Sequence, residues 1–445
     1  MSRRYFGTDG VRGRVGKPPM TVDFALRLAS AAARVLAPGG GTVLIGKDTR
    51  LSGYMFEAAL EAGFTAAGAN VLLAGPLPTP AVAYLCRRLG ADFGIVISAS
   101  HNLYEDNGIK IFAAGGEKLS DEQEAAIEAL IDEPPLTLES MALGHARRVD
   151  HARVDYQEFC KSMLPPGVGL SGFKLVIDCA HGASYKVAPR VLAELGAEII
   201  PIGCSPNGRN INQGCGSTQP ALLATTVTGV GACMGIALDG DGDRCVLVDE
   251  HGALVDGDQL LYVLARDAHA RGELTGPVVG TVMSNLGLEQ ALGTLHIPFM
   301  RAAVGDRYVM GMLKAHGGQI GGETSGHIIN LRKTSTGDGL ATALQVLAAM
   351  QHSGQSLSAL VAGMERLPQV MINVRVARRI DVDGSPAIQA AVREAEAELG
   401  ERGRIVLRAS GTEPVIRVMV EAEDPAETQA LAVRLADIVR AAAEH

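Results

Sequence analysis

Short apolar runs alternate with longer stretches of helical periodicity along most of the chain. This alternation is typical of strand–helix units built around a mainly parallel sheet. A similar plan recurs three times, and each recurrence begins and ends with an apolar run. The first runs lie at 42–46, 174–181 and 277–284, and the last at 94–101, 234–244 and 319–327. The pattern therefore predicts an α/β fold with three similar domains, each with a mixed or parallel sheet.

Polar residues stand where these apolar runs end. The first runs end near Asp48, Asp178 and Ser284, and the last end at Ser100, Asp239 and Glu323. Open α/β sheets place their ligands at the carboxyl ends of the strands. We therefore expect the three sheets to direct their loops toward one central cleft.

The pattern changes after Leu367 and Pro368. Strand-like runs follow at 370–376, 404–408 and 415–421, and a terminal helix is expected from about Pro425. The last two strands are close enough to form a hairpin, which predicts a smaller α+β domain at this end. With a helix break at Pro134 and Pro135, the expected domains are 1–150, 151–253, 254–367 and 368–445.

Composition narrows the class of protein. The chain has 445 residues, of which 54 are glycine, 17 are Tyr or Phe and none is Trp. We therefore expect many tight turns and an aliphatic core, in two to four domains that are each large enough to bury a core of their own. The net charge of −9, with no run of basic residues, argues against a nucleic-acid partner.

The scattered cysteines and the lack of a long apolar segment predict the cellular compartment of the protein. No segment approaches the roughly 18 uninterrupted apolar residues of a membrane span, and no apolar stretch follows the basic residues near Met1, so neither membrane insertion nor a signal peptide is expected. The seven cysteines are scattered without a Cys-x-x-Cys pair. Such a set is typical of reduced thiols, and we expect a cytoplasmic protein.

The segment Asp239-Gly-Asp-Gly-Asp-Arg244 carries the sharpest chemical signal. Three carboxylates at alternate positions can surround a hard divalent cation, and a site with so few protein ligands suits Mg²⁺. An EF-hand fails, because Arg244 stands where that loop needs glycine and a strand pattern follows at 245–248. A solvated acidic turn is the alternative without chemistry.

A serine and an imidazole follow an apolar run in Ser98-Ala-Ser-His-Asn102, with Lys110 shortly after them. The segment lacks the Gly-x-Ser-x-Gly pattern of a hydrolase nucleophile. An ordinary turn after a strand would explain it equally well. Lys110 is suited to neutralising a phosphate or moving a proton.

Three further segments contain groups that bind anions or sugar hydroxyls. Arg408, Ser410, Gly411, Thr412 and Arg417 combine guanidinium groups, hydroxyls and a close backbone approach, as phosphate binding requires, although a plain hairpin turn is the alternative. A carboxylate, a hydroxyl and an imidazole in Gly322-Glu-Thr-Ser-Gly-His327 can form hydrogen bonds with sugar hydroxyls. The alternative interpretation of this segment is a helix cap. The segment Phe6–Gly13 carries Arg12, which is long enough to reach an anion. The alternative interpretation of this segment is a flexible entry loop. Together these groups indicate phosphoryl transfer to a polar polyol.

With these segments in this order, the chain resembles the α-D-phosphohexomutase superfamily over essentially its whole length. The matching motifs are Gly7-Thr-Asp-Gly-Val-Arg-Gly13, Ser98-Ala-Ser-His-Asn102, Asp239-Gly-Asp-Gly-Asp-Arg244, Gly322-Glu-Thr-Ser-Gly-His327 and Arg408-Ala-Ser-Gly-Thr-Glu-Pro414. The first motif, together with Val304-Gly-Asp-Arg-Tyr308, looks more like the amino-sugar branch than the phosphomannomutase/phosphoglucomutase branch. One departure is Leu103, which stands where the superfamily usually has proline.

The resemblance implies a role for each of these residues. Ser100 would be the phosphoserine, and Asp239, Asp241 and Asp243 would hold Mg²⁺ together with a phosphoserine oxygen. Arg12, His101, Lys110 and Arg244 would surround the phosphoserine, with Lys110 or His327 as the acid/base. Glu323 and Ser325 would bind the sugar hydroxyls, and Arg408, Ser410, Gly411, Thr412 and Arg417 would bind the phosphate that does not react.

The implied reaction interconverts glucosamine 6-phosphate and glucosamine 1-phosphate, with glucosamine 1,6-bisphosphate as intermediate and activator. It leads toward UDP-N-acetylglucosamine and the cell wall. The expected partner is this phosphosugar, and the expected assembly is a monomer or a homodimer. A phosphomannomutase/phosphoglucomutase, a Mg²⁺-dependent sugar phosphatase and a phosphosugar sensor remain as alternatives.

Overall fold

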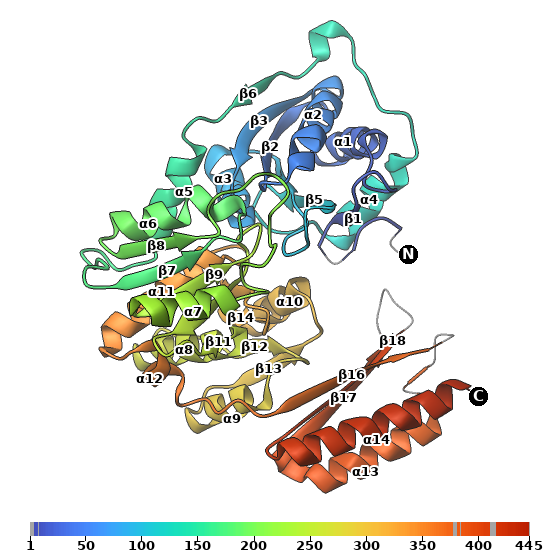
Figure 1. Ribbon diagram of the computed structural model, residues 1–445. Helices are drawn as coiled ribbons and strands as arrows, with labels where there is room; N and C mark the ends of the chain where they lie inside the picture. The colour runs from blue at the N-terminus through green and yellow to red at the C-terminus, as the bar shows by residue number, and fades with distance from the viewer. Residues whose placement is uncertain (1–3, 8, 377–380, 383, 410–414, 445) are drawn as a thin grey trace.

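Four sheets follow one another along the molecule (Figure 1). The computed structural model describes residues 4–7, 9–376, 381–382, 384–409 and 415–444. Helices cover the first three sheets, and a smaller three-stranded sheet lies on two helices at the end of the chain. The predicted α/β architecture is therefore confirmed. Within these residues, no helix is both long and apolar enough to cross a membrane.

The first sheet has six strands in the order β1-β5-β4-β2-β3-β6. Its elements are β1 (Val11–Arg14), α1 (Val22–Leu36), β2 (Gly41–Lys47), α2 (Leu51–Ala66), β3 (Ala69–Pro76), α3 (Thr79–Leu89), β4 (Phe93–Ile97), β5 (Asp106–Ala113), α4 (Asp121–Ile131) and β6 (Ala146–Arg148). The pattern predicted β2, β3 and β4, but not β5. Because β5 returns antiparallel to β4 with Lys110 opposite Val96, it brings Lys110 back toward the serine loop.

The second sheet, in the order β11-β10-β9-β7-β8, repeats this arrangement. Its elements are α5 (Ala152–Lys161), β7 (Lys174–Asp178), α6 (Ala188–Glu194), β8 (Glu198–Ile202), α7 (Ala221–Val230), β9 (Met234–Leu238), β10 (Cys245–Asp249) and β11 (Leu254–Val255). Strand β9 pairs parallel with β7 and antiparallel with β10. The acidic segment Asp239–Arg244 is therefore the loop between β9 and β10.

The third sheet has the order β13-β12-β14-β15. Its elements are α8 (Gly257–Ala270), β12 (Val278–Thr281), α9 (Leu286–Thr294), β13 (Phe299–Ala302), α10 (Asp306–His316), β14 (Ile320–Gly322), β15 (Ile328–Asn330), α11 (Gly339–Ser353) and α12 (Leu357–Val361). Helix α8 begins after Asp256, which forms a capping box with Gln259. The segment Glu323–His327 connects β14 to its antiparallel partner β15.

The largest apolar cluster runs through the first three domains, and smaller clusters lie within single domains. Its buried members include Leu85, Tyr156, Ile177, Leu261 and Leu347. The C-terminal domain has a separate cluster. The first three domains are thus packed together through shared apolar side chains, and no described residue of the last domain belongs to that cluster.

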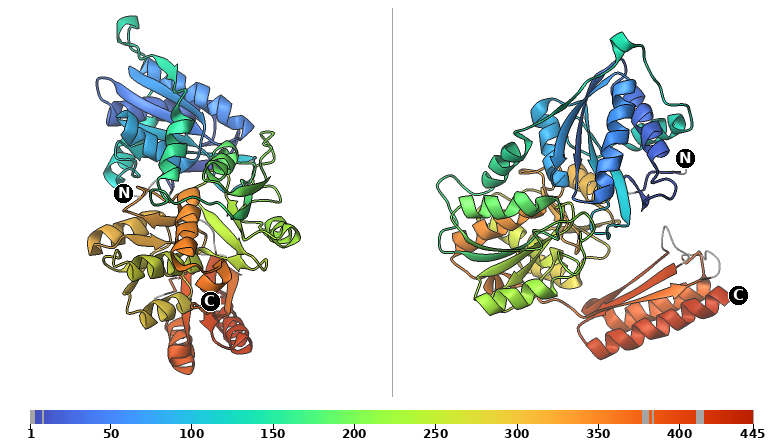
Figure 2. Two further views of the ribbon diagram at one scale, coloured as in Figure 1. Left: turned by 90° about the vertical axis from the view of Figure 1, so that its left-hand side faces the viewer. Right: turned by 45° about the horizontal axis from the view of Figure 1, so that its top comes forward.

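The C-terminal domain is an antiparallel sheet on a helix pair. Its elements are β16 (Gln369–Arg375), α13 (Pro386–Leu399), β17 (Gly403–Ala409), β18 (Val415–Ala422) and α14 (Pro425–Glu444), in the strand order β16-β18-β17. The two helices lie side by side in both Figure 1 and Figure 2. Polar contacts join its base to the third domain: Arg404 donates to the Val282 carbonyl over 2.8 Å, and Glu421 accepts from the Leu286 amide over 2.9 Å.

Candidate active site

Ser100 lies in a tight turn directly after β4. Its φ of +51° is in the left-handed region, which costs free energy for any residue with a side chain. The Ser100 hydroxyl donates to Asp239 Oδ2 over 2.6 Å, and its amide donates to Ser98 Oγ over 2.9 Å. The Asn102 amide donates to the Ala99 carbonyl over 3.1 Å and closes this turn. Leu103, which stands in place of the expected proline, begins the next turn, where its carbonyl accepts from the Asp106 amide over 3.3 Å.

Two residues that the sequence did not indicate hold this turn. Arg50 is fully buried and ion-paired with Asp48. Its guanidinium donates to the carbonyls of Ser100 and Asn102 over 3.3 and 2.5 Å. Asn212, from the second domain, donates to the same two carbonyls over 2.9 and 2.8 Å. The first two domains therefore both support the strained conformation of the serine.

The three aspartates of the acidic loop converge beside Ser100. Asp239, Asp241 and Asp243 are buried, and one carboxylate oxygen of each lies within 4.8 Å of the others. The loop passes so close to the serine turn that a Cβ on Gly240 would lie 2.6 Å from the Ser100 carbonyl oxygen. Glycine at this position is what allows the acidic loop to approach the serine.

The aspartate cluster has more negative charge than its immediate partners neutralise. Lys110 Nζ lies 2.8 Å from Asp241 Oδ2 and 3.3 Å from Asp243 Oδ2, and Thr79 donates to Asp241 over 2.6 Å. The second oxygens of Asp241 and Asp243 are buried without a hydrogen-bond partner among the described residues. Burial and the two neighbouring carboxylates raise the pKa of Asp239 well above its usual range. Buried carboxylate oxygens that lack a hydrogen bond fit a hard divalent cation.

The charged side chains of the cluster and its neighbours shift one another's pKa values. Although burial opposes both shifts, Asp241 and Asp9 raise the pKa of Lys110, and Lys110 lowers the pKa of Asp243. Arg12 is ion-paired with Asp9. Asp9 is therefore an ion-pair partner of both Lys110 and Arg12.

Arg244 and two histidines complete this centre. Arg244 Nε lies 3.8 Å from Asp243 Oδ1, and its backbone amide donates to Asp239. Burial, followed by the charges of Arg244 and Arg12, lowers the pKa of His101 to about 4. Although burial opposes it, Asp243 raises the pKa of His327, whose Nδ1 lies 3.8 Å from Asp243 Oδ1. The motifs of the first three domains therefore meet at one place.

The motifs expected to bind the sugar hydroxyls and the distant phosphate differ in their contacts with this centre. Glu323 is close enough to Arg244 to raise the pKa of its guanidinium, after the larger effects of burial, which opposes the shift, and of Asp243 and Asp239. Ser325 is exposed on the same loop. Arg408 and Arg417 face each other across β17 and β18, and neither is hydrogen-bonded or ion-paired with a described residue of the first three domains. Ser410, Gly411 and Thr412 lie outside the described residues.

Asp258 is a further residue that the sequence did not indicate. It accepts hydrogen bonds from the Asn285 amide over 2.9 Å and from the hydroxyl of Thr324 over 2.8 Å, and Thr324 lies between Glu323 and Ser325. Its second oxygen is buried without a partner among the described residues. Burial and the nearby Asp256 raise the pKa of Asp258 to about 6.

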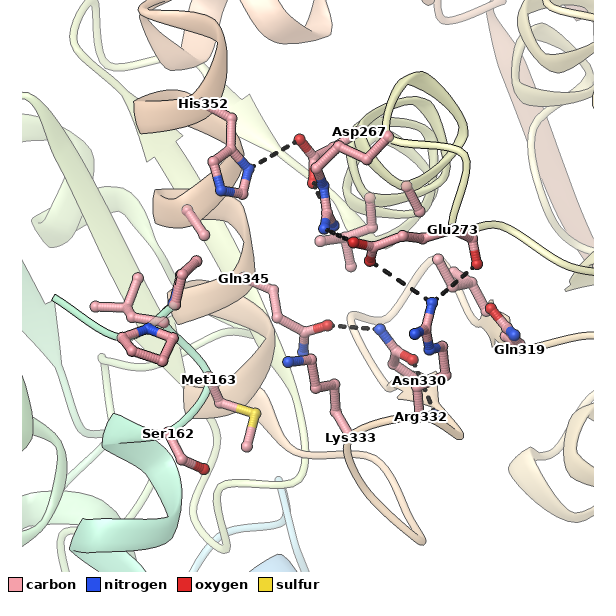
Figure 3. A pocket seen from close by; sticks show the side chains of 18 residues that line it. Ser162, Met163, Asp267, Glu273, Gln319, Asn330, Arg332, Lys333, Gln345 and His352 are labelled. Carbon is pink, nitrogen blue, oxygen red and sulfur yellow. Dashed lines mark hydrogen bonds and ion pairs between the residues drawn. The ribbon is translucent and has the colours of Figure 1, made fainter. Parts of the chain in front are cut away.

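A separate pocket lies between α8 and α11, away from this centre (Figure 3). It has a volume of about 380 Å³. Asp267 contacts Arg271 and His352 at 2.9 and 3.2 Å, and Glu273 contacts Arg271 and Arg332 at 2.6 and 3.6 Å. Asp267 and Glu273 are thus both paired with basic side chains of the pocket.

Comparisons with known proteins identify the family. Models of the four phosphoglucomutase/phosphomannomutase domains match in order: alpha/beta/alpha domain I at 3–136, domain II at 156–252, domain III at 256–367 and the C-terminal domain at 371–438. The phosphoglucosamine mutase of Thiobacillus denitrificans is 56% identical over 100% of this chain and 98% of its own length. That of Alkalilimnicola ehrlichii is 57% identical over 99% and 98%.

This chain belongs to the phosphoglucosamine mutases. Like the other members of this family within the phosphohexomutase superfamily, it is an isomerase that transfers a phosphoryl group within its substrate. A solved phosphoglucomutase/phosphomannomutase family protein from Burkholderia thailandensis has the same fold, with a TM-score of 0.83, 24% identity and coverage of 99% of this chain and 98% of its own.

The role of Arg50 in holding the serine turn gives a first prediction. Arg50→Met should lower both the melting temperature and kcat, because the Ser100 turn loses donors and Asp48 becomes an unpaired buried charge that costs about 3 kcal/mol or more. The double variant Asp48→Asn, Arg50→Met should regain part of the melting temperature but not kcat. Calorimetry and mutase assays measure the two effects, and an Arg50→Met enzyme with wild-type kcat would refute the role.

The raised pKa of Asp258 gives a pH-dependent prediction. Its pKa of about 6 in the folded chain lies above the usual value of 3.8. The stability that the carboxyl contributes is therefore fully present below about pH 4 and is lost as the pH rises through 6. Relative to Asp258→Asn, the wild-type protein should lose about 1–3 kcal/mol between pH 4 and pH 8. Thermal melts of both proteins across this range measure it; a difference that does not change with pH would contradict it.

Proposed function

We propose that this chain interconverts glucosamine 6-phosphate and glucosamine 1-phosphate, with Ser100 as the group that carries the phosphoryl. The observation that supports this most is the placement of the Ser100 hydroxyl, buried against Asp239 in a turn that two domains hold. A serine that serves only to cap a turn would not need a strained backbone beside three carboxylates. The names of the relatives supply the amino-sugar substrate.

Phosphoryl transfer occurs in two steps that mirror each other. Phosphorylated Ser100 gives its phosphoryl group to O1 of glucosamine 6-phosphate, and the serine oxygen is the leaving group. The resulting 1,6-bisphosphate turns around, and its 6-phosphoryl group returns to Ser100. Lys110 or His327, the two groups that flank Asp243, gives a proton to the departing serine oxygen and takes up the proton of the attacking hydroxyl, so that it regains its starting state. Free bisphosphate recharges an enzyme that has lost its phosphoryl group.

The surrounding residues neutralise and position the phosphates. Arg12, His101, Lys110 and Arg244 surround the phosphoryl group on Ser100, where charge compensation and alignment supply most of the catalysis. Glu323 and Ser325 bind the sugar hydroxyls. Arg408 and Arg417, with Ser410, Gly411 and Thr412, bind the phosphate at the other end of the sugar. One cradle of this kind serves both monophosphates, because either end of the sugar must reach Ser100.

The donor set fits magnesium. Asp239, Asp241, Asp243 and an oxygen on Ser100 would hold the ion, since Mg²⁺ prefers a few carboxylates together with phosphate oxygens. When bound, the ion supplies positive charge that polarises the phosphoryl oxygens. The buried oxygens of Asp241 and Asp243 that accept no hydrogen bond from a described residue are the observation that supports this assignment.

Removal of the serine hydroxyl tests the function. Ser100→Ala should abolish mutase turnover while the melting temperature stays close to that of the wild type. Ser30→Ala is the matched control, because it removes a buried hydroxyl of the same domain whose partner is the Leu136 amide, and it leaves the serine turn unchanged. Mutase activity in Ser100→Ala would refute the proposal, and stoichiometric phosphate release by the wild type without isomer formation would favour a phosphatase instead.

Thermal melts test the metal site without an activity assay. Added Mg²⁺ should raise the melting temperature of the wild type. Asp239→Asn should melt no lower than the wild type in the absence of the ion, because it removes one of three repelling charges, but should lose the Mg²⁺-dependent rise. Asp249→Asn, at the far end of β10, is the control and should keep that rise. Equal shifts in all three proteins would contradict the assignment.

A further inference from the structure

A row of charged side chains joins His327 of the third domain to Lys110, and its middle members, Asp306, Lys118 and Asp9, have no role in the mechanism above. Asp306 Oδ2 lies 3.5 Å from His327 Nε2, and Asp306 Oδ1 lies 2.7 Å from Lys118 Nζ. Lys118 Nζ lies 2.7 Å from Asp9 Oδ1, and Asp9 Oδ2 lies 2.9 Å from Lys110 Nζ. Acidic and basic groups thus alternate along the whole row.

The row closes into a ring at the aspartate cluster. Asp243 lies 3.3 Å from Lys110 and 3.8 Å from His327, through different oxygens. The ring takes Asp9, Lys110 and Lys118 from the first domain, Asp243 from the second and Asp306 and His327 from the third. Each carboxylate lies between two basic groups, so a change at one member alters the balance of forces on its neighbours.

Asp9 is the member through which Lys118 acts on the reacting centre. One oxygen of Asp9 contacts Lys118, and the other contacts both Lys110 and Arg12. Lys118 therefore fixes the rotation of the carboxylate. Without the positive charge of Lys118, both oxygens of Asp9 would be available to Lys110 and Arg12, and would draw them away from Ser100 and the aspartates.

Burial strengthens the interactions among these charges. The side chains of Lys118, Asp306 and Asp9 are 18%, 15% and 23% exposed, and that of Lys110 is only 3% exposed. Charges in such surroundings interact more strongly than on an open surface. The negative charge of Asp9 must therefore be matched by the cations in contact with it, which are Lys110, Arg12 and Lys118. Of these, Lys118 alone is not among the residues proposed to bind the phosphate.

We propose that Lys118, held by Asp306, is a positioning residue for phosphoryl transfer, which keeps Asp9 oriented so that Lys110 and Arg12 stay beside Ser100. This inference rests on the proposed function. It also gives a role to the segment Val304–Tyr308, since Asp306 reaches the first domain from the start of α10. Misplacement of a catalytic group by about 1 Å can cost about 100-fold in rate.

Arg307, the next residue along, supplies a matched control. It donates to the Leu119 carbonyl over 3.2 Å and to Glu124 over 2.5 Å, and it is ion-paired with Asp121. It therefore joins the same two domains as the Asp306–Lys118 pair does. Its partners lie on and just before α4, and Asp9 is not one of them. Loss of Arg307 should weaken the domain contact without changing the orientation of Asp9.

The test compares Lys118→Met, Lys118→Arg and Arg307→Met in the full-length enzyme, by kcat, KM and melting temperature. Lys118→Met should lower kcat about 10- to 100-fold with KM nearly unchanged, and Lys118→Arg should restore most of kcat. Arg307→Met should lower the melting temperature but keep kcat within about threefold of the wild type. The rate of phosphoryl transfer from phosphorylated Ser100 to glucosamine 6-phosphate in a single turnover should fall only in Lys118→Met.

Two results would overturn the inference: wild-type kcat in Lys118→Met, or equal losses of kcat in Lys118→Met and Arg307→Met. If Lys118→Met does not fold, Lys118→Gln takes its place, and wild-type kcat in that variant likewise overturns the inference. An inactive wild-type enzyme would instead refute the proposed function, so the two failures are distinguishable.

Discussion

Mutual repulsion among three buried aspartates is the constraint on which the rest of the site depends. Asp239, Asp241 and Asp243 come together within 4.8 Å because the chain between them is folded tightly against the serine turn. Charges so close and so poorly hydrated must be compensated. Besides Arg244 of the same loop, compensating groups come from other domains: Lys110 from the first and His327 from the third. The first three domains therefore have to be packed as one body, and their shared apolar cluster achieves this.

The three domains position their site loops with the same arrangement of strands. In each, a strand that pairs in parallel with a neighbour is followed by a loop and then by an antiparallel strand: β4 to β5, β9 to β10 and β14 to β15. The loop therefore stands at the edge of the sheet where open α/β sheets bind ligands. The C-terminal domain differs, because its core is separate and Arg404 and Glu421 join it to the third domain through polar contacts. The surface that we propose to bind the distant phosphate can thus be built on this domain independently of the reacting centre.

The sequence was sufficient for the parts whose signal is local. The apolar runs predicted β4, β9 and β14, and the motifs placed Ser100 and the aspartates at their ends. The residues that hold Ser100 could not be predicted in this way, since their partners lie far along the chain. Arg50 is an example: arginine is rarely fully buried, and only the fold shows that it faces the carbonyls of the serine turn. Lys118 and Asp306 meet only because α10 packs against the first domain.

The most direct test of the central claim follows a labelled phosphoryl group. The enzyme is phosphorylated on Ser100 with ³²P-labelled sugar bisphosphate, freed of small molecules and mixed with unlabelled glucosamine 6-phosphate. The account predicts that about one label per phosphorylated chain leaves the protein and appears in glucosamine phosphates, with little in inorganic phosphate. Label that stays on the protein during turnover, or that leaves only as inorganic phosphate, would contradict it.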